Sequence, residues 1–236
     1  MNRVRILLVT AAIAVGIGLW FAFTAPVDRL QGEFSRIVNI HAPFLWVAFL
    51  AFGVTALASI MWLVKKTRRW DRLGEASAEL GVVFTVAGLF TGMVWGQAVW
   101  GRAWDWGDAR LATTAVMLFV YIGYLALRRA TPDPEMRARR SAILGAVAVV
   151  QVPLVYFSVY MFRTLHQTPS IRPDGATMPD EMLIALLINF LAVTYLYFAL
   201  LVARLYVARV EEAMVVDGSL AGDAVKPPRL SEVEDV

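Results

Sequence analysis

The segment PFLWVAFLAFGVTALASIMWLV, Pro43–Val64, contains no charged residue and is followed directly by the basic segment KKTRRWDR, residues 65–72. A run of roughly 20 predominantly apolar residues is long enough to cross the hydrocarbon core of a bilayer as an α-helix. Five further runs of comparable length lie along the chain: Ile6–Phe23, Leu80–Trp100, Leu111–Leu127, Ala142–Phe162 and Met182–Leu205. The sequence therefore predicts an all-α membrane protein with six transmembrane helices.

The composition agrees with a chain that is surrounded by membrane lipid. Hydrophobic residues make up 59% of the 236 residues, charged residues 17%, and the mean hydropathy is +0.62. A soluble domain is about half apolar and about a quarter charged. We expect one membrane domain over residues 1–209 and a polar, acidic and disordered cytoplasmic tail over residues 210–236. The bulky end of the first run predicts a retained anchor rather than a cleaved signal peptide.

The distribution of Lys and Arg between the loops predicts the orientation of the helices. Basic residues gather in the cytoplasmic loops of membrane proteins. Five lie after the second run and five after the fourth, whereas the three alternate loops hold two each. Both termini are therefore predicted to be cytoplasmic, and the sparse loops to face the periplasm. The basic residues of the two rich loops are Lys65, Lys66, Arg68, Arg69, Arg72, Arg128, Arg129, Arg137, Arg139 and Arg140.

Several functional classes are disfavoured by what the sequence lacks. The chain has no cysteine, which excludes disulfides, thiolate metal ligands and a covalent CxxCH haem site. No charged residue lies well inside an apolar run, and this disfavours an ion-coupled permease. No GxxxxGK[ST] motif is present, so any ATP hydrolysis belongs to a partner. Nothing in the sequence predicts binding to nucleic acid.

The densest motif is WGQAVWGRAWDWGDARL, Trp95–Leu111, which holds four of the eight tryptophans and is called the tryptophan loop below. Interfacial belts also contain tryptophan, but a belt spreads it over many helix ends. Indoles can lie against a flat apolar ligand, and the interleaved glycines let the backbone approach it. The two arginines can meet ligand carboxylates or pair with the neighbouring aspartates. We favour the interpretation as a ligand platform. Its candidate binding residues are Trp95, Trp100, Arg102, Trp104, Trp106, Asp108 and Arg110.

The only two histidines of the chain are predicted to lie at the same membrane face as the tryptophan loop. His41 precedes the Pro43–Val64 run, and His166 follows the Ala142–Phe162 run. A lone histidine is often a hydrogen-bonded interface residue, but a pair of imidazoles can also hold haem iron from both sides. Both interpretations remain open on the residues alone. Met161 and Met178 are the nearest alternative ligands at this face.

Three further features of the runs carry structural expectations. Gly88, Gly92 and Gly96 form a stripe that predicts close helix packing, with a direct ligand role as the less favoured alternative. Pro153 predicts a kink in the fifth run, and Asn189 a hydrogen bond to a neighbouring helix.

The tryptophan loop resembles the WWD motif of the haem-handling membrane proteins of cytochrome c biogenesis. Six spans, one histidine before the second span and one after the fifth resemble the CcmC family, the haem exporter protein C of system I cytochrome c maturation. The resemblance covers Met1 to about Arg209. Larger relatives with more spans and more histidines, CcmF and the CcsA-type synthases, are less similar.

The resemblance implies a haem b at the outer face of the bacterial inner membrane, with His41 and His166 as the axial iron ligands. It implies that haem is presented to the periplasmic chaperone CcmE, in a complex with CcmD and the CcmA–CcmB ABC transporter. Such a chain is a haem-binding and transfer subunit, not an enzyme. The alternatives are a cytochrome c synthase acting directly on apocytochrome, and an electron-transfer b-type cytochrome, whose histidines usually lie inside the helix bundle.

Overall fold

The computed structural model describes residues 2–162, 164–168, 170–172 and 175–220, and of residues 215–220 only the backbone. Within them, six segments are long and apolar enough to cross a membrane, so the predicted number of spans is confirmed. Two of these segments each combine two consecutive helices. In chain order the elements are α1 (Asn2–Thr24), the 3₁₀ helix η1 (Glu33–Ile37), α2 (Val38–Lys65), α3 (Arg68–Trp100), α4 (Ala109–Ala130), α5 (Pro134–Ala148), α6 (Gln151–Met161), β1 (Ile171–Arg172), β2 (Gly175–Ala176) and α7 (Asp180–Leu220).

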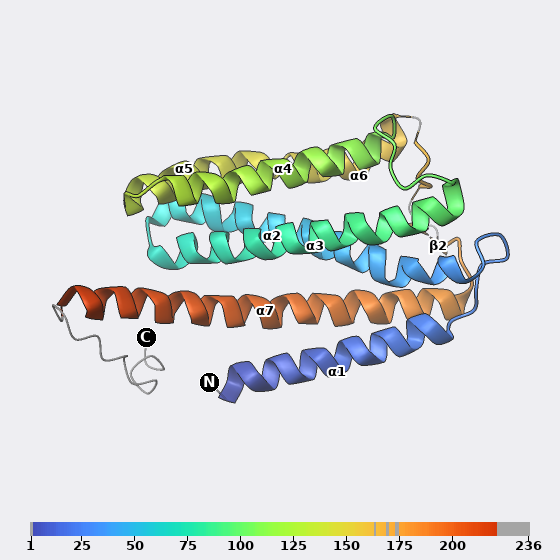
Figure 1. Ribbon diagram of the computed structural model, residues 1–236, viewed down its shortest axis with the longest axis horizontal. Coiled ribbons are helices and arrows are strands. Elements are labelled where there is room, and N and C mark those ends of the chain that lie inside the picture. The colour runs from blue at the N-terminus through green and yellow to red at the C-terminus, as the bar shows by residue number, and fades with distance from the viewer. Residues whose placement is uncertain (1, 163, 169, 173–174, 221–236) are drawn as a thin grey trace.

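The spans run side by side with alternating direction (Figure 1). Helices α2 and α3 lie in the middle, α4, α5 and α6 cover one side, and α7 and α1 cover the other. This path brings the tryptophan loop, the segment 25–37 and the described residues between α6 and α7 to one end of the molecule. The beginning of α1, the end of α7 and the α2–α3 and α4–α5 connections lie at the opposite end. The loops predicted to share a membrane face therefore share an end of the molecule.

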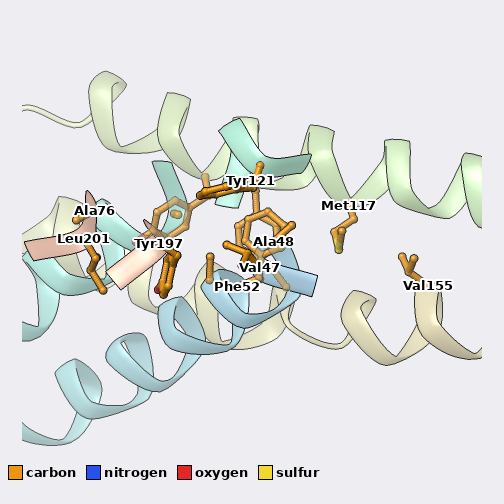
Figure 2. Packing of buried hydrophobic residues seen from close by; sticks show 14 of the residues in the cluster. Val47, Ala48, Phe52, Ala76, Met117, Tyr121, Val155, Tyr197 and Leu201 are labelled. Atoms are coloured by element: carbon orange, nitrogen blue, oxygen red, sulfur yellow. The ribbon is translucent and has the colours of Figure 1, made fainter. Parts of the chain in front are cut away.

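Aromatic side chains fill the middle of the bundle between the central helices and α4 and α7 (Figure 2). The rings of Phe52 and Tyr121 are stacked, with centroids 3.5 Å apart and planes within 13°. Tyr197 of α7 is also fully buried, and its hydroxyl bonds Ser77 Oγ at 2.7 Å. A Cβ at Gly81 of α3 would lie only 2.4 Å from the Phe52 ring. Small residues thus let α2 and α3 approach closely around large rings.

The fifth span is divided into two helices just before Pro153. Helix α5 ends at Ala148 and α6 begins at Gln151. Proline lacks an N–H group and clashes with the carbonyl four residues before it, so a continuous α-helix is interrupted just before this position. The predicted bond of Asn189 is also confirmed, because its Nδ2 donates to the Gly18 carbonyl of α1 at 2.8 Å.

Helix α3 begins at Arg68, well before the predicted start of its span at Leu80. This polar extension is held by ion pairs to neighbouring helices. Arg128 of α4 contacts Asp71 at 2.6 Å and Glu75 at 2.8 Å, and Arg204 of α7 contacts Glu79 at 2.6 Å. Hydropathy marks only the apolar part of a helix, so it cannot reveal such an extension.

The last helix also exceeds its expected length. Helix α7 continues to Leu220, past the boundary expected at Arg209. Residues 221–236 lie outside the described part of the chain, and the division into a membrane domain and a disordered tail stays a prediction.

Candidate functional site

The candidate residues come from five parts of the chain that meet at the same end of the molecule. His41 lies in the first turns of α2, and Trp95 and Trp100 lie in the last turns of α3. Arg110 lies in the first turn of α4, while His166 belongs to the segment between α6 and β1. The remaining candidates, Arg102, Trp104, Trp106 and Asp108, form the connection between α3 and α4.

His41 is fixed by the helix that packs against α2. Its Nδ1 donates to the Gly88 carbonyl of α3 at 2.9 Å and lies 3.4 Å from the Thr91 hydroxyl. A carbonyl oxygen only accepts hydrogen bonds, so this contact places the ring proton on Nδ1. The Nε2 of His41 then carries a lone pair, and it makes no hydrogen bond with any described residue.

His166 has the same arrangement with a different partner. Its Nδ1 lies 3.1 Å from Oδ1 of Asp108, whose side chain is fully buried. The edge of the imidazole packs on the Trp100 ring, with centroids 4.8 Å apart and planes at 74°. A carboxylate is an acceptor, so the proton again lies on Nδ1 and leaves a lone pair on Nε2. Both histidines therefore present a nitrogen that is free to bind a metal.

The charge state of the Asp108–His166 pair follows from its surroundings. Burial raises the pKa of the Asp108 carboxyl, but the hydrogen bonds that it accepts outweigh this effect and hold the pKa below its ordinary value. Burial lowers the pKa of the His166 imidazole, and this exceeds the opposing effect of Asp108. The pair is therefore a carboxylate beside a neutral imidazole at neutral pH. Neutral imidazole is the form that binds metals.

The tryptophans divide into two pairs. Trp95 and Trp100 meet edge to face, with ring centroids 4.6 Å apart, and Trp100 continues this contact to His166. Trp104 and Trp106 meet edge to face at 5.0 Å. Trp106 is 67% exposed, whereas Nε1 of Trp104 is buried without an acceptor among the described residues. One of the two tryptophan pairs is therefore in direct ring contact with a candidate histidine.

The two candidate arginines have different surroundings. Arg102 donates to Asp105 Oδ2 at 2.8 Å, and its side chain is 58% exposed. The guanidinium of Arg110 makes no hydrogen bond or ion pair with a described residue, although it is half-buried. Its charge acts on both His41 and His166. Among the described residues, Arg110 is therefore a cation close to both histidines and without a partner of its own.

The glycine stripe packs closely against neighbouring groups, as predicted. One of these groups is the ring of His41, a candidate iron ligand. A Cβ at Gly88 would lie 2.5 Å from the Leu45 side chain, and a Cβ at Gly92 would lie 2.8 Å from Cε1 of His41. A Cβ at Gly96 would lie 3.1 Å from the Arg102 carbonyl oxygen. The stripe makes room for α2, for the His41 ring and for the turn of the tryptophan loop.

Residues that the sequence did not single out also support the site. Gln31 accepts a hydrogen bond from Nε1 of Trp95 at 3.0 Å, and the Leu165 N–H donates to Asp108 Oδ2 at 2.7 Å. Of the alternative ligands, Met161 is exposed, and Met178 lines a cavity of about 350 Å³ that Gln31 and Trp95 also line but neither histidine does. Backbone partners have no signature in the sequence, and Gln31 lies in a loop without any motif.

The arrangement suits a flat, metal-bearing ligand with anionic groups. Both imidazoles have an Nε2 without a hydrogen bond to a described residue, and an indole packs against His166. The charge of Arg110, which has no partner among the described residues, acts on both rings. Within the described ranges, His, Cys, Asp and Glu do not gather in groups of three that could hold a bare metal ion. The chemistry of the donors therefore favours a metal that arrives inside a ligand and needs only two positions from the protein.

Known proteins that are similar to this chain also handle haem, according to their names. The family model described as Heme exporter protein C matches residues 1–216. The chain is 37% identical to Heme exporter protein C of Bradyrhizobium diazoefficiens over 82% of this chain and 73% of that protein. It is 34% identical to Heme exporter protein C of Haemophilus influenzae, over 81% and 78%. It is 31% identical to a putative cytochrome c biosynthesis ccmC-like mitochondrial protein of Arabidopsis thaliana, over 90% and 85%. The chain is a multi-pass membrane protein that belongs to the Heme exporter protein C family of cytochrome c maturation.

Proposed function

We propose that this chain binds haem b at the outer face of the bacterial inner membrane and presents it to the periplasmic haem chaperone CcmE. It acts in a complex with CcmD and the CcmA–CcmB ABC transporter, which hydrolyses the ATP. The chain itself is a binding and transfer subunit without an enzymatic step. The family and the names of its relatives support this function.

The observation that carries the proposal is the state of the two histidines. His41 and His166 each use Nδ1 for a hydrogen bond to an acceptor of the protein, and each leaves Nε2 free. Haem supplies an iron with two axial positions that imidazole nitrogens can fill. Partners that fix the tautomer and the direction of a ligand ring are typical of metal-binding histidines. His41 and His166 are therefore proposed as the two axial ligands.

Other side chains at the same end fit the rest of a haem. The indoles of Trp95, Trp100, Trp104 and Trp106 offer flat apolar surface. The guanidinium of Arg110 and the indole N–H of Trp104 have no partner among the described residues, and both are donors that suit propionate groups. Arg102 is already paired with Asp105, so its proposed contribution is to hold the loop.

The proposed orientation rests on the basic loops. The tryptophan loop lies at the end opposite to the two loops that are rich in Lys and Arg. Because such loops stay in the cytoplasm, the site faces the periplasm. Reporter fusions at Arg69 and Arg137 should therefore read cytoplasmic and a fusion at Asp105 periplasmic. The reverse pattern would contradict the assignment of the site to the outer face.

Co-expression with CcmE and an apocytochrome tests the function. We expect the wild-type chain to yield haem covalently attached to the chaperone, and His41→Ala and His166→Ala to abolish most of it. Gln167→Ala is the matched control in the same segment, because the one hydrogen bond of the Gln167 side chain to a described residue is with Ser170. It should load the chaperone normally. Holocytochrome formed without any CcmE would instead identify a cytochrome c synthase.

A further inference from the structure

We propose that Asp108 is a positioning residue for His166 and does not bind the ligand itself. In this role the carboxylate sets which nitrogen of the His166 ring is free and the direction in which it points. The inference deepens the proposed function, on which it rests for the identity of the ligand. The predicted tautomer of the His166 ring does not require haem, so it can be measured in the haem-free protein.

All the described contacts of the Asp108 side chain are with its own protein. Oδ1 accepts from the Leu111 N–H at 2.9 Å and from His166 Nδ1 at 3.1 Å. Oδ2 accepts from the Leu165 N–H at 2.7 Å. The side chain is fully buried under these contacts. It has no open surface on which a haem group could lie, and its effect on a ligand must pass through His166.

Asp133 shows what an N-cap aspartate does without a histidine. Its Oδ1 accepts from the Met136 N–H at 2.6 Å at the start of α5, just as Asp108 caps α4. Asp133 lies at the opposite end of the molecule. Capping explains the choice of aspartate at both positions. Only Asp108 also joins its helix to the segment that carries His166, and this is the additional role assigned here.

The same contacts make the two proposed ligands unequal. His41 donates to a neutral carbonyl within two packed helices, whereas His166 donates to a carboxylate from a loop segment. A carboxylate partner raises the basicity of an imidazole ligand more than a neutral acceptor does. It also couples the position of His166 to the tryptophan loop, because Asp108 is the last residue before α4.

Selective ¹⁵N labelling of histidine tests the tautomer in the haem-free, full-length protein. The chain has two histidines, so the spectrum contains two imidazoles, which His41→Ala assigns. We expect both rings in the Nδ1–H form. In Asp108→Asn the amide still caps α4, but it offers a weaker acceptor, or an NH₂ group, to the ring. His166 should then lose its single tautomer while His41 stays unchanged, and Asp133→Asn should alter neither.

An Nε2–H form of His166 in the wild-type protein would overturn the proposal, and this result does not require a folded Asp108 variant. An unchanged His166 tautomer in correctly folded Asp108→Asn would overturn it as well.

A second measurement separates this inference from the proposed function. Titration with haemin should show about 10- to 100-fold weaker binding for Asp108→Asn, the usual effect of losing such a partner. When His166 is already replaced by Ala, Asp108→Asn should alter the affinity for haemin by less than about twofold. If Asp108 acts only through His166, its effect disappears once His166 is removed. Additive losses would mean that Asp108 acts on haem directly and would overturn the inference alone. Unchanged haemin binding in His166→Ala would overturn the proposed ligand.

Discussion

Arg102 and Arg110 have the same charge and flank the same tryptophans, yet the structure separates their roles. Arg102 points to solvent and pairs with Asp105, and an exposed pair of this kind contributes little. Arg110 is half-buried with no partner among the described residues, and its charge acts on both histidines. A sequence pattern treats the two alike, because it records charge and spacing but not pairing.

Arg110→Gln is therefore expected to weaken haem binding, while Arg102→Gln leaves it nearly unchanged. A hydrogen bond to a charged group contributes about 1.5–3 kcal/mol, which corresponds to roughly 10- to 100-fold in affinity. Titration of both purified variants with haemin measures the difference. Equal losses in the two variants, or a greater loss for Arg102→Gln, would contradict the proposed propionate contact of Arg110.

At the scale of elements, the contact between α2 and α3 positions the first histidine. Gly92 lies directly against the His41 ring, and a methyl group there would be 2.8 Å from Cε1. The ring is held from the same helix by the Gly88 carbonyl, so it has little freedom to move. The glycine stripe therefore both lets α2 and α3 pack closely and positions the His41 ring.

Gly92→Ala should displace the His41 ring and lower haemin affinity by about tenfold or more, since ligand direction is set by such packing. Gly53→Ala is the matched control, because a Cβ at Gly53 of α2 meets no atom within 4 Å. Its affinity should equal that of the wild type. Normal binding in folded Gly92→Ala would show that the imidazole position does not depend on this contact.

At the opposite end of the bundle, ion pairs join α3 to α4. The Arg128 side chain is 3% exposed and bonds both Asp71 and Glu75 of α3. Removing one partner of a buried ion pair typically costs about 3–5 kcal/mol, and the partial exposure of Asp71 and Glu75 places the cost here at the lower end. The neighbouring Arg129 is exposed at the surface of the same helix.

Arg128→Met should accordingly lower the free energy of unfolding by about 3 kcal/mol, whereas Arg129→Met should change it by less than about 0.5 kcal/mol. Thermal unfolding of both variants in the same detergent measures this difference. Similar midpoints for the two variants would mean that the Arg128 pairs do not hold α3 to α4.

Over the whole molecule, apolar run length and motif spacing predicted much of the architecture. The six spans follow from hydropathy, and the alternation of their direction places both histidines and the tryptophans at one end. The polar start of α3 was missed, because Asp71 and Glu75 look like loop residues until Arg128 is placed beside them. The partners of the histidines were also missed, since a backbone carbonyl such as that of Gly88 leaves no trace in a sequence.

The central claim is that His41 and His166 bind the same haem iron, and the absorption and EPR spectra of the purified protein test it most directly. We expect one haem per chain with a low-spin, six-coordinate spectrum, because two imidazoles fill both axial positions. His41→Ala and His166→Ala should each shift the spectrum toward high spin, and added imidazole should partly restore it. A wild-type spectrum in both variants, or two haems per chain, would contradict the claim.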